Sequence, residues 1–131
     1  MYIVFDENVP DKLVEGLKTL APIASDHTFE ITSVKLLAKA GTPDEDVLNL
    51  IGKNGILITY DADFKKQRNL YAAIKDYNIG LFWVKQPKKI TFWFLVKVMI
   101  ANWQEILELC VNEDRPFIFE VTKNGVEQRT F

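Results

Sequence analysis

Apolar and polar positions alternate along this chain in a pattern that predicts short strands separated by helices. Apolar runs predict five strands, at residues 3–5, 29–34, 56–60, 80–84 and 117–121. Apolar residues at helical spacing predict helices at residues 11–20, 44–53, 70–77 and 91–113. The Asn-Gly pair at 124–125 predicts a turn, and so a C-terminal hairpin that reaches Arg129. Strands that alternate with helices indicate an α/β fold, in which helices cover both faces of a mostly parallel sheet.

The longest predicted helix carries an apolar stripe that we expect to face the core. Its members are Phe92, Leu95, Val96, Met99, Trp103, Ile106, Leu107 and Cys110. Trp93, Phe94 and Val98 lie off this stripe, so we expect them to form an apolar surface that supports a homodimer. At the other end of the chain, Asn8 is the expected N-cap of the first helix, with Pro10 in its first turn.

Composition restricts the class of protein. A chain of 131 residues with 48% hydrophobic and 26% charged residues is expected to form a single domain over residues 1–131. The single cysteine excludes an internal disulfide, and with no visible signal peptide this favours a cytoplasmic protein. No stretch is apolar for long enough to predict a membrane span. The net charge of −2 argues against a protein whose whole surface binds nucleic acid, but it leaves room for a local basic path.

Carboxylates follow the predicted strands. Asp6 and Glu7 come directly after the first strand, Asp61 and Asp63 follow the strand "ILITY", and three acids open the helix at residue 44. The carboxyl ends of parallel strands meet at one edge of a sheet, which is where ligands bind in such folds. Acids gathered there repel one another unless a cation is present, and Mg²⁺ or Mn²⁺ prefers carboxylate oxygens.

Structural explanations compete with a metal site at each cluster. The stretch "TPDE" at 42–45 matches a capping box, which would account for Glu45. Asp44 shares a helix face with Val47 and Leu48, so we expect it to point toward the sheet edge. Asp46 is on a different face.

A helix cap would need only one of the two acids at 61 and 63, so a pair favours function there. Asn8 can cap the first helix and leaves Asp6 without a structural task. Glu7 should point away from Asp6 if the backbone stays extended.

Other polar residues give weaker signals. His27 is the only histidine and has no second histidine with which to form a zinc site. The basic residues Lys65, Lys66 and Arg68 directly follow Asp63, where they would contact the phosphates of a nucleic acid beside a metal.

Three acidic motifs in this order resemble those of PIN-like nuclease domains, and most closely the VapC-type toxins of toxin–antitoxin systems. The motifs are "FDENVP", "GTPDEDVL" and "ITYDADF", and the resemblance continues through "GLFWVKQP" and "RPFIFEVT". It implies a three-layer α/β/α sandwich with a carboxylate-bound metal and ribonuclease activity. Glu7 corresponds to an acid that is common in this branch, and Thr59 to a hydroxyl residue before the Asp pair. The implied metal ligands and catalytic residues are Asp6, Asp44, Asp61 and Asp63.

The resulting hypothesis is an Mg²⁺- or Mn²⁺-dependent endoribonuclease that acts on RNA and is inhibited by a cognate antitoxin protein. Two alternatives stay open at this stage. A receiver-like signalling domain also places acids after strands and a lysine before a proline, as in Lys85-Gln86-Pro87. A PIN-like binding module without catalytic activity is the other.

Overall fold

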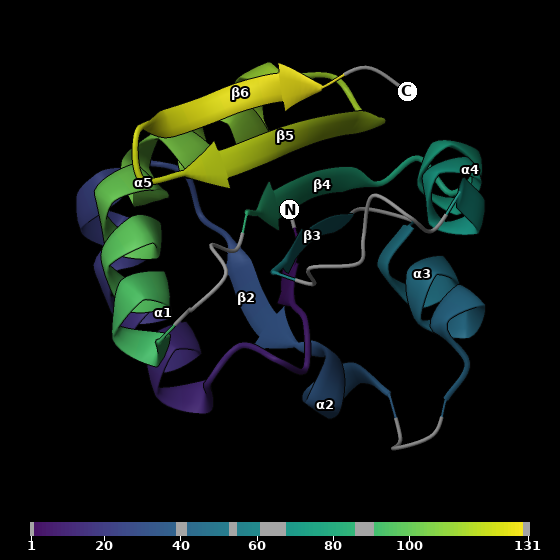
Figure 1. Ribbon diagram of the computed structural model, residues 1–131, viewed down its shortest axis with the longest axis horizontal. Helices are drawn as coiled ribbons and strands as arrows, with labels where there is room; N and C mark the ends of the chain where they lie inside the picture. The colour runs from purple at the N-terminus through teal and green to yellow at the C-terminus, as the bar shows by residue number, and fades with distance from the viewer. Residues whose placement is uncertain (1, 39–41, 53–54, 61–67, 86–90, 130–131) are drawn as a thin grey trace.

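The computed structural model describes residues 2–38, 42–52, 55–60, 68–85 and 91–129 (Figure 1). The strands are β1 (Tyr2–Phe5), β2 (Glu30–Ser33), β3 (Gly55–Thr59), β4 (Gly80–Val84), β5 (Phe117–Thr122) and β6 (Gly125–Arg129). The helices are α1 (Asp11–Ala24), α2 (Val34–Leu37), α3 (Asp44–Gly52), α4 (Arg68–Asp76) and α5 (Phe92–Asn112). The five predicted strands and four predicted helices are all present, and α2 is an additional short helix.

The strands form a six-stranded sheet in the order β2-β1-β3-β4-β5-β6. The first five are parallel to their neighbours, whereas β6 runs antiparallel to β5. Figure 1 shows α1 and α5 on one side of this sheet, and α3 and α4 on the other. The mostly parallel α/β fold and the C-terminal hairpin were therefore predicted correctly, and the carboxyl ends of β1 to β5 lie at one edge.

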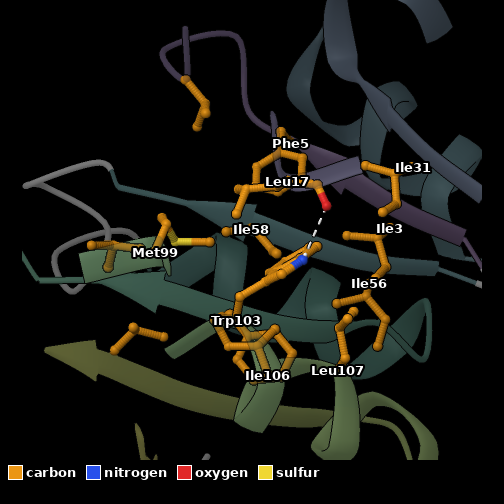
Figure 2. Packing of buried hydrophobic residues seen from close by; sticks show 14 of the residues in the cluster. Ile3, Phe5, Leu17, Ile31, Ile56, Ile58, Met99, Trp103, Ile106 and Leu107 are labelled. Atoms are coloured by element: carbon orange, nitrogen blue, oxygen red, sulfur yellow. Dashed lines mark hydrogen bonds between the residues drawn. The ribbon is translucent and has the colours of Figure 1, made fainter. Parts of the chain in front are cut away.

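The larger core lies between the sheet and the helices α1 and α5. Trp103 of α5 is at its centre in Figure 2, with its ring 6.1 Å from that of Phe5 and its indole N–H donating to the carbonyl of Leu17 at 3.1 Å. A smaller core on the opposite face joins α3 and α4 to the sheet through residues such as Leu48, Ile74 and Leu57. These two cores fix the sheet from both sides.

The start and end of α1 differ from the predictions. The residue at the N-cap is Pro10, without a side-chain cap, so the prediction for Asn8 was wrong. Instead, Asn8 Nδ2 lies 3.5 Å from Asp6 Oδ2. The helix also continues past residue 20 to Ala24 and includes Pro22. Proline removes one backbone N–H, and the buried Ala21 holds this last turn against the core.

The buried face of α5 is rotated from the predicted stripe. Phe92 is 63% exposed, whereas Val98 is only 3% exposed and belongs to the core. Asn102 is buried in the same face because its Nδ2 donates to the carbonyls of Val98 and Thr122, at 2.8 and 2.9 Å. A polar residue with these two partners anchors the helix to the hairpin, which an apolar pattern does not predict.

The predicted dimer surface changes accordingly. Val98 is unavailable for a subunit contact because it packs inside the molecule, and Phe94 packs partly against the core. Trp93, at 66% exposed, lies on the surface with Phe92 and Ile100. The homodimer itself stays a prediction. Among the described residues, no helix is long and apolar enough to cross a membrane.

Cys110 should be almost unreactive in the folded protein. It is 1% exposed, and burial raises the pKa of its thiol from the ordinary 9.0 to about 12, so the reactive thiolate is scarce at pH 8. We expect very slow labelling by a disulfide reagent in buffer and complete labelling in urea. The raised pKa also means that stability is lost as the pH rises from about 9 toward 12. Equal labelling rates with and without urea would contradict the burial of Cys110.

Candidate functional site

Asp6 follows β1 at the carboxyl edge of the sheet. Its backbone N–H donates to the carbonyl of Ile58 at 2.9 Å, which continues the pairing with β3 by one residue. Its own carbonyl then accepts from the N–H of Val9 at 3.0 Å, which closes a turn before α1. These two backbone bonds hold Asp6 between the end of a central strand and the start of a helix.

The Asp6 carboxylate points toward β3. Thr59 is 4% exposed, and its hydroxyl donates to Asp6 Oδ2 at 2.7 Å. Thr59 lies two residues after Leu57 in β3, so the two side chains point to the same face of the sheet. Leu57 packs on the side of α3 and α4, so the Asp6 carboxylate that Thr59 contacts also lies on that face. The half-buried Asp6 therefore has one carboxylate oxygen fixed by the hydroxyl of Thr59.

Tyr60 joins the loop after β1 to the end of β3. Its hydroxyl donates to the carbonyl of Asn8. Burial, and then the negative charge of Asp6, raise the pKa of Tyr60, so the phenol stays protonated and can donate this bond at neutral pH. The residue after β3 thus lies beside the turn that follows Asp6. The sequence pattern did not reveal this contact.

The structure places some of the other predicted residues. Glu7 is exposed in the turn after Asp6. Asp44 begins α3 and Arg68 begins α4, but their side chains lie outside the described residues. Asp61, Asp63, Lys65 and Lys66 lie outside them entirely. Of the predicted metal ligands, the structure therefore brings Asp6 to the carboxyl edge and places Glu7 beside it, exposed.

The residues present suit a hard divalent cation. The five proposed ligands are four aspartates and Glu7, and carboxylate oxygens are the donors that Mg²⁺ and Mn²⁺ prefer. The bond from Thr59 holds one oxygen of the Asp6 carboxylate in place. Within the side chains that the structure describes, no group of three or more His, Cys, Asp or Glu residues could hold a metal ion. Among the proposed ligands that the structure describes, Asp6 is hydrogen-bonded to Thr59 and Glu7 is exposed.

A second acidic residue was missed by the sequence pattern. Glu120 of β5 is 1% exposed, and its Oε2 accepts from Arg129 Nε at 2.6 Å and lies 2.5 Å from Arg129 Nη2. Its Oε1 lies 3.7 Å from Lys85 Nζ. Arg129 also contacts Glu127 at 3.2 Å, and these carboxylates raise the pKa of its guanidinium. A charged residue inside the apolar run "FIFEVT" was the available signal.

The comparisons with known proteins give one result. A model of the family described as "PIN like domain" matches residues 1–86, which is 86 of the 131 residues. The matched range includes the three acidic motifs and the four aspartates proposed as ligands. Searches of curated proteins and of solved structures each found no match. With its mostly parallel sheet and its acid at the end of β1, the chain belongs to the PIN-like domain family, which indicates a nuclease-type function.

Proposed function

We propose that this protein is a metal-dependent endoribonuclease and the toxin of a toxin–antitoxin pair. The observation that supports a nuclease most directly is the family match over residues 1–86, together with Asp6 held by Thr59 at the carboxyl edge. The position agrees with the rule that parallel sheets bind ligands outside the carboxyl ends of their strands.

Asp6, Asp44, Asp61 and Asp63 would hold one or two Mg²⁺ or Mn²⁺ ions, with Glu7 as an additional ligand. A bound cation would lower the pKa of water and offset the charge that develops on the phosphate oxygens. The hydroxyl of Thr59 fixes one oxygen of Asp6, so the carboxylate needs little reorganisation to bind. Lys65, Lys66 and Arg68 would contact the RNA backbone beside the metal.

Metal removal tests this proposal. We expect purified protein with Mn²⁺ to cleave a labelled RNA pool, and EDTA to lower the rate by at least about 100-fold, because a bound cation would lower the pKa of the attacking water. Adding excess Mn²⁺ should restore the activity. Cleavage that persists unchanged in EDTA, after removal of contaminating nucleases by a second purification step, would rule out a metal-dependent enzyme.

The toxin assignment rests on the resemblance of the three acidic motifs to VapC-type toxins. A cognate antitoxin would inhibit by covering the acidic edge, and an arginine is suited to pair with its carboxylates. Expression of the protein alone should slow bacterial growth, and co-expression of a small neighbouring reading frame should relieve the effect. Growth that is unaffected by an active enzyme would refute a toxin.

A PIN-like binding module without catalysis is the alternative. It predicts that Mn²⁺ and RNA bind while no RNA is cleaved. The family match argues against the receiver-like alternative, which would be revived only if acetyl phosphate labelled one aspartate.

A further inference from the structure

Glu120 lies in line with the candidate site but too far away to belong to it. The pairings Thr59↔Trp83 and Trp83↔Glu120 place Glu120 in the row of residues that starts at Asp6 and Thr59. These residues share the face of α3 and α4. Three strand spacings of about 4.8 Å separate β1 from β5, so Glu120 is about 14 Å from Asp6 and cannot bind the same metal ion.

The charge of Glu120 is already matched by Arg129. Nε and Nη2 of Arg129 lie 2.6 and 2.5 Å from Oε2 of Glu120, which is a close, charge-assisted contact. Lys85 lies 3.7 Å from the other oxygen, which is beyond hydrogen-bond distance. Lys85, Glu120 and Arg129 together carry a net charge of +1, and Glu127, which lies 3.2 Å from Arg129, brings the whole cluster to zero. The exposed Glu127 contacts Arg129 from the edge strand β6, two strands away from Lys85.

Lys85 is held in place at its backbone while its ammonium group reaches solvent. It directly follows β4, and its N–H donates to the carbonyl of Val121 at 3.0 Å. Its side chain is 58% exposed, and within the described part of the chain its ammonium has an ion pair but no hydrogen bond. Among the described residues, the three N–H donors of the Lys85 ammonium therefore have no hydrogen-bond acceptor, and they lie at the same edge and on the same face as Asp6.

We propose that Lys85 binds a phosphate of the RNA strand that flanks the cleaved phosphate. This inference rests on the proposed function, because it takes RNA as the ligand. A strand with its cleaved bond at Asp6 carries further phosphates along the sheet edge, and the overall charge of −2 makes a local cation necessary to hold them.

Binding of a fluorescein-labelled single-stranded RNA, measured by anisotropy in EDTA to prevent cleavage, tests this assignment. We expect Lys85→Met to raise the Kd about five-fold and to reduce the slope of log Kd against log [KCl] by about 0.7, the change for one phosphate on a single strand. Lys85→Arg should retain most of the affinity. The matched control is Lys97→Met, because Lys97 is exposed on α5, which packs on the opposite face.

A second measurement uses the wild-type protein and does not depend on folding of a variant. RNA should protect Lys85, but not Lys97, from acetylation by a water-soluble, amine-reactive reagent, with the extent of acetylation measured by mass spectrometry. Equal affinity and salt slope for the two methionine variants, unchanged labelling of Lys85, or no RNA binding by the wild type would each overturn the assignment. RNA binding that depends on Lys85, without cleavage in Mn²⁺, would support it while rejecting the proposed nuclease activity.

Discussion

Asp6→Asn should lower the rate of Mn²⁺-dependent RNA cleavage by at least about 100-fold while the protein stays folded. An amide has the size of the carboxylate, and its oxygen can still accept from the hydroxyl of Thr59, now at 2.7 Å from Asp6 Oδ2. What is removed is the negative charge that a divalent cation requires. The affinity for Mn²⁺ should fall in parallel, and the loss in both quantities can be measured by single-turnover cleavage and by calorimetric titration.

The matched control is Asp46→Asn, which removes an equivalent charge from an exposed position of α3. Its rate should stay within about two-fold of the wild type, because Asp46 is on a different helix face from Asp44 and its exposed charge is screened by solvent. Circular dichroism melting curves should be similar for both variants. If Asp6→Asn and Asp46→Asn had the same activity, Asp6 would have no role in catalysis.

Most of the fold follows from apolar periodicity. The continuous apolar runs at β3 and β4 predict strands buried on both faces, and both strands are fully buried in the structure. Helix boundaries were less predictable because contacts from distant residues decide them. Ala21, which is buried in the core, holds α1 in place beyond the predicted end at residue 20. Asn102 likewise rotates the buried face of α5 through bonds that reach Val98 and Thr122.

The candidate site was predictable to the extent that chemistry follows strand ends. A carboxylate directly after an apolar strand predicts that Asp6 lies at the carboxyl edge of the sheet, where the structure places it, whereas its role as a metal ligand stays a prediction. The assignment of Asn8 as a cap failed, because its backbone and side chain contact Tyr60 and Asp6 instead. The contact between Tyr60 and Asn8 joins residues that are 52 positions apart, so no local pattern reveals it. The pairing of Glu120 with Lys85 and Arg129 depends in the same way on strand order.

Trp103→Ala should cause the largest loss of stability, about 3–5 kcal/mol in the free energy of unfolding. The indole is 2% exposed and lies between α1 and the sheet, where it contacts Phe5 and donates to Leu17 (Figure 2). Truncation leaves a cavity in the larger core and removes one interhelical hydrogen bond. Because Phe5 directly precedes Asp6, the change should also loosen the end of β1 and lower activity at temperatures where the protein is still folded.

Two further variants separate the causes of this loss. Trp103→Phe keeps a ring beside Phe5 but removes the hydrogen bond to Leu17, so it should cost less than the alanine variant. Trp93→Ala, at a position that is 66% exposed, should change stability by less than about 0.5 kcal/mol. Urea denaturation followed by circular dichroism measures all three variants on one scale. Similar losses in the free energy of unfolding for Trp93→Ala and Trp103→Ala would contradict this prediction. They would mean that Trp93 is buried in solution, as it would be in a dimer, and that burial of Trp103 in the core does not set it apart.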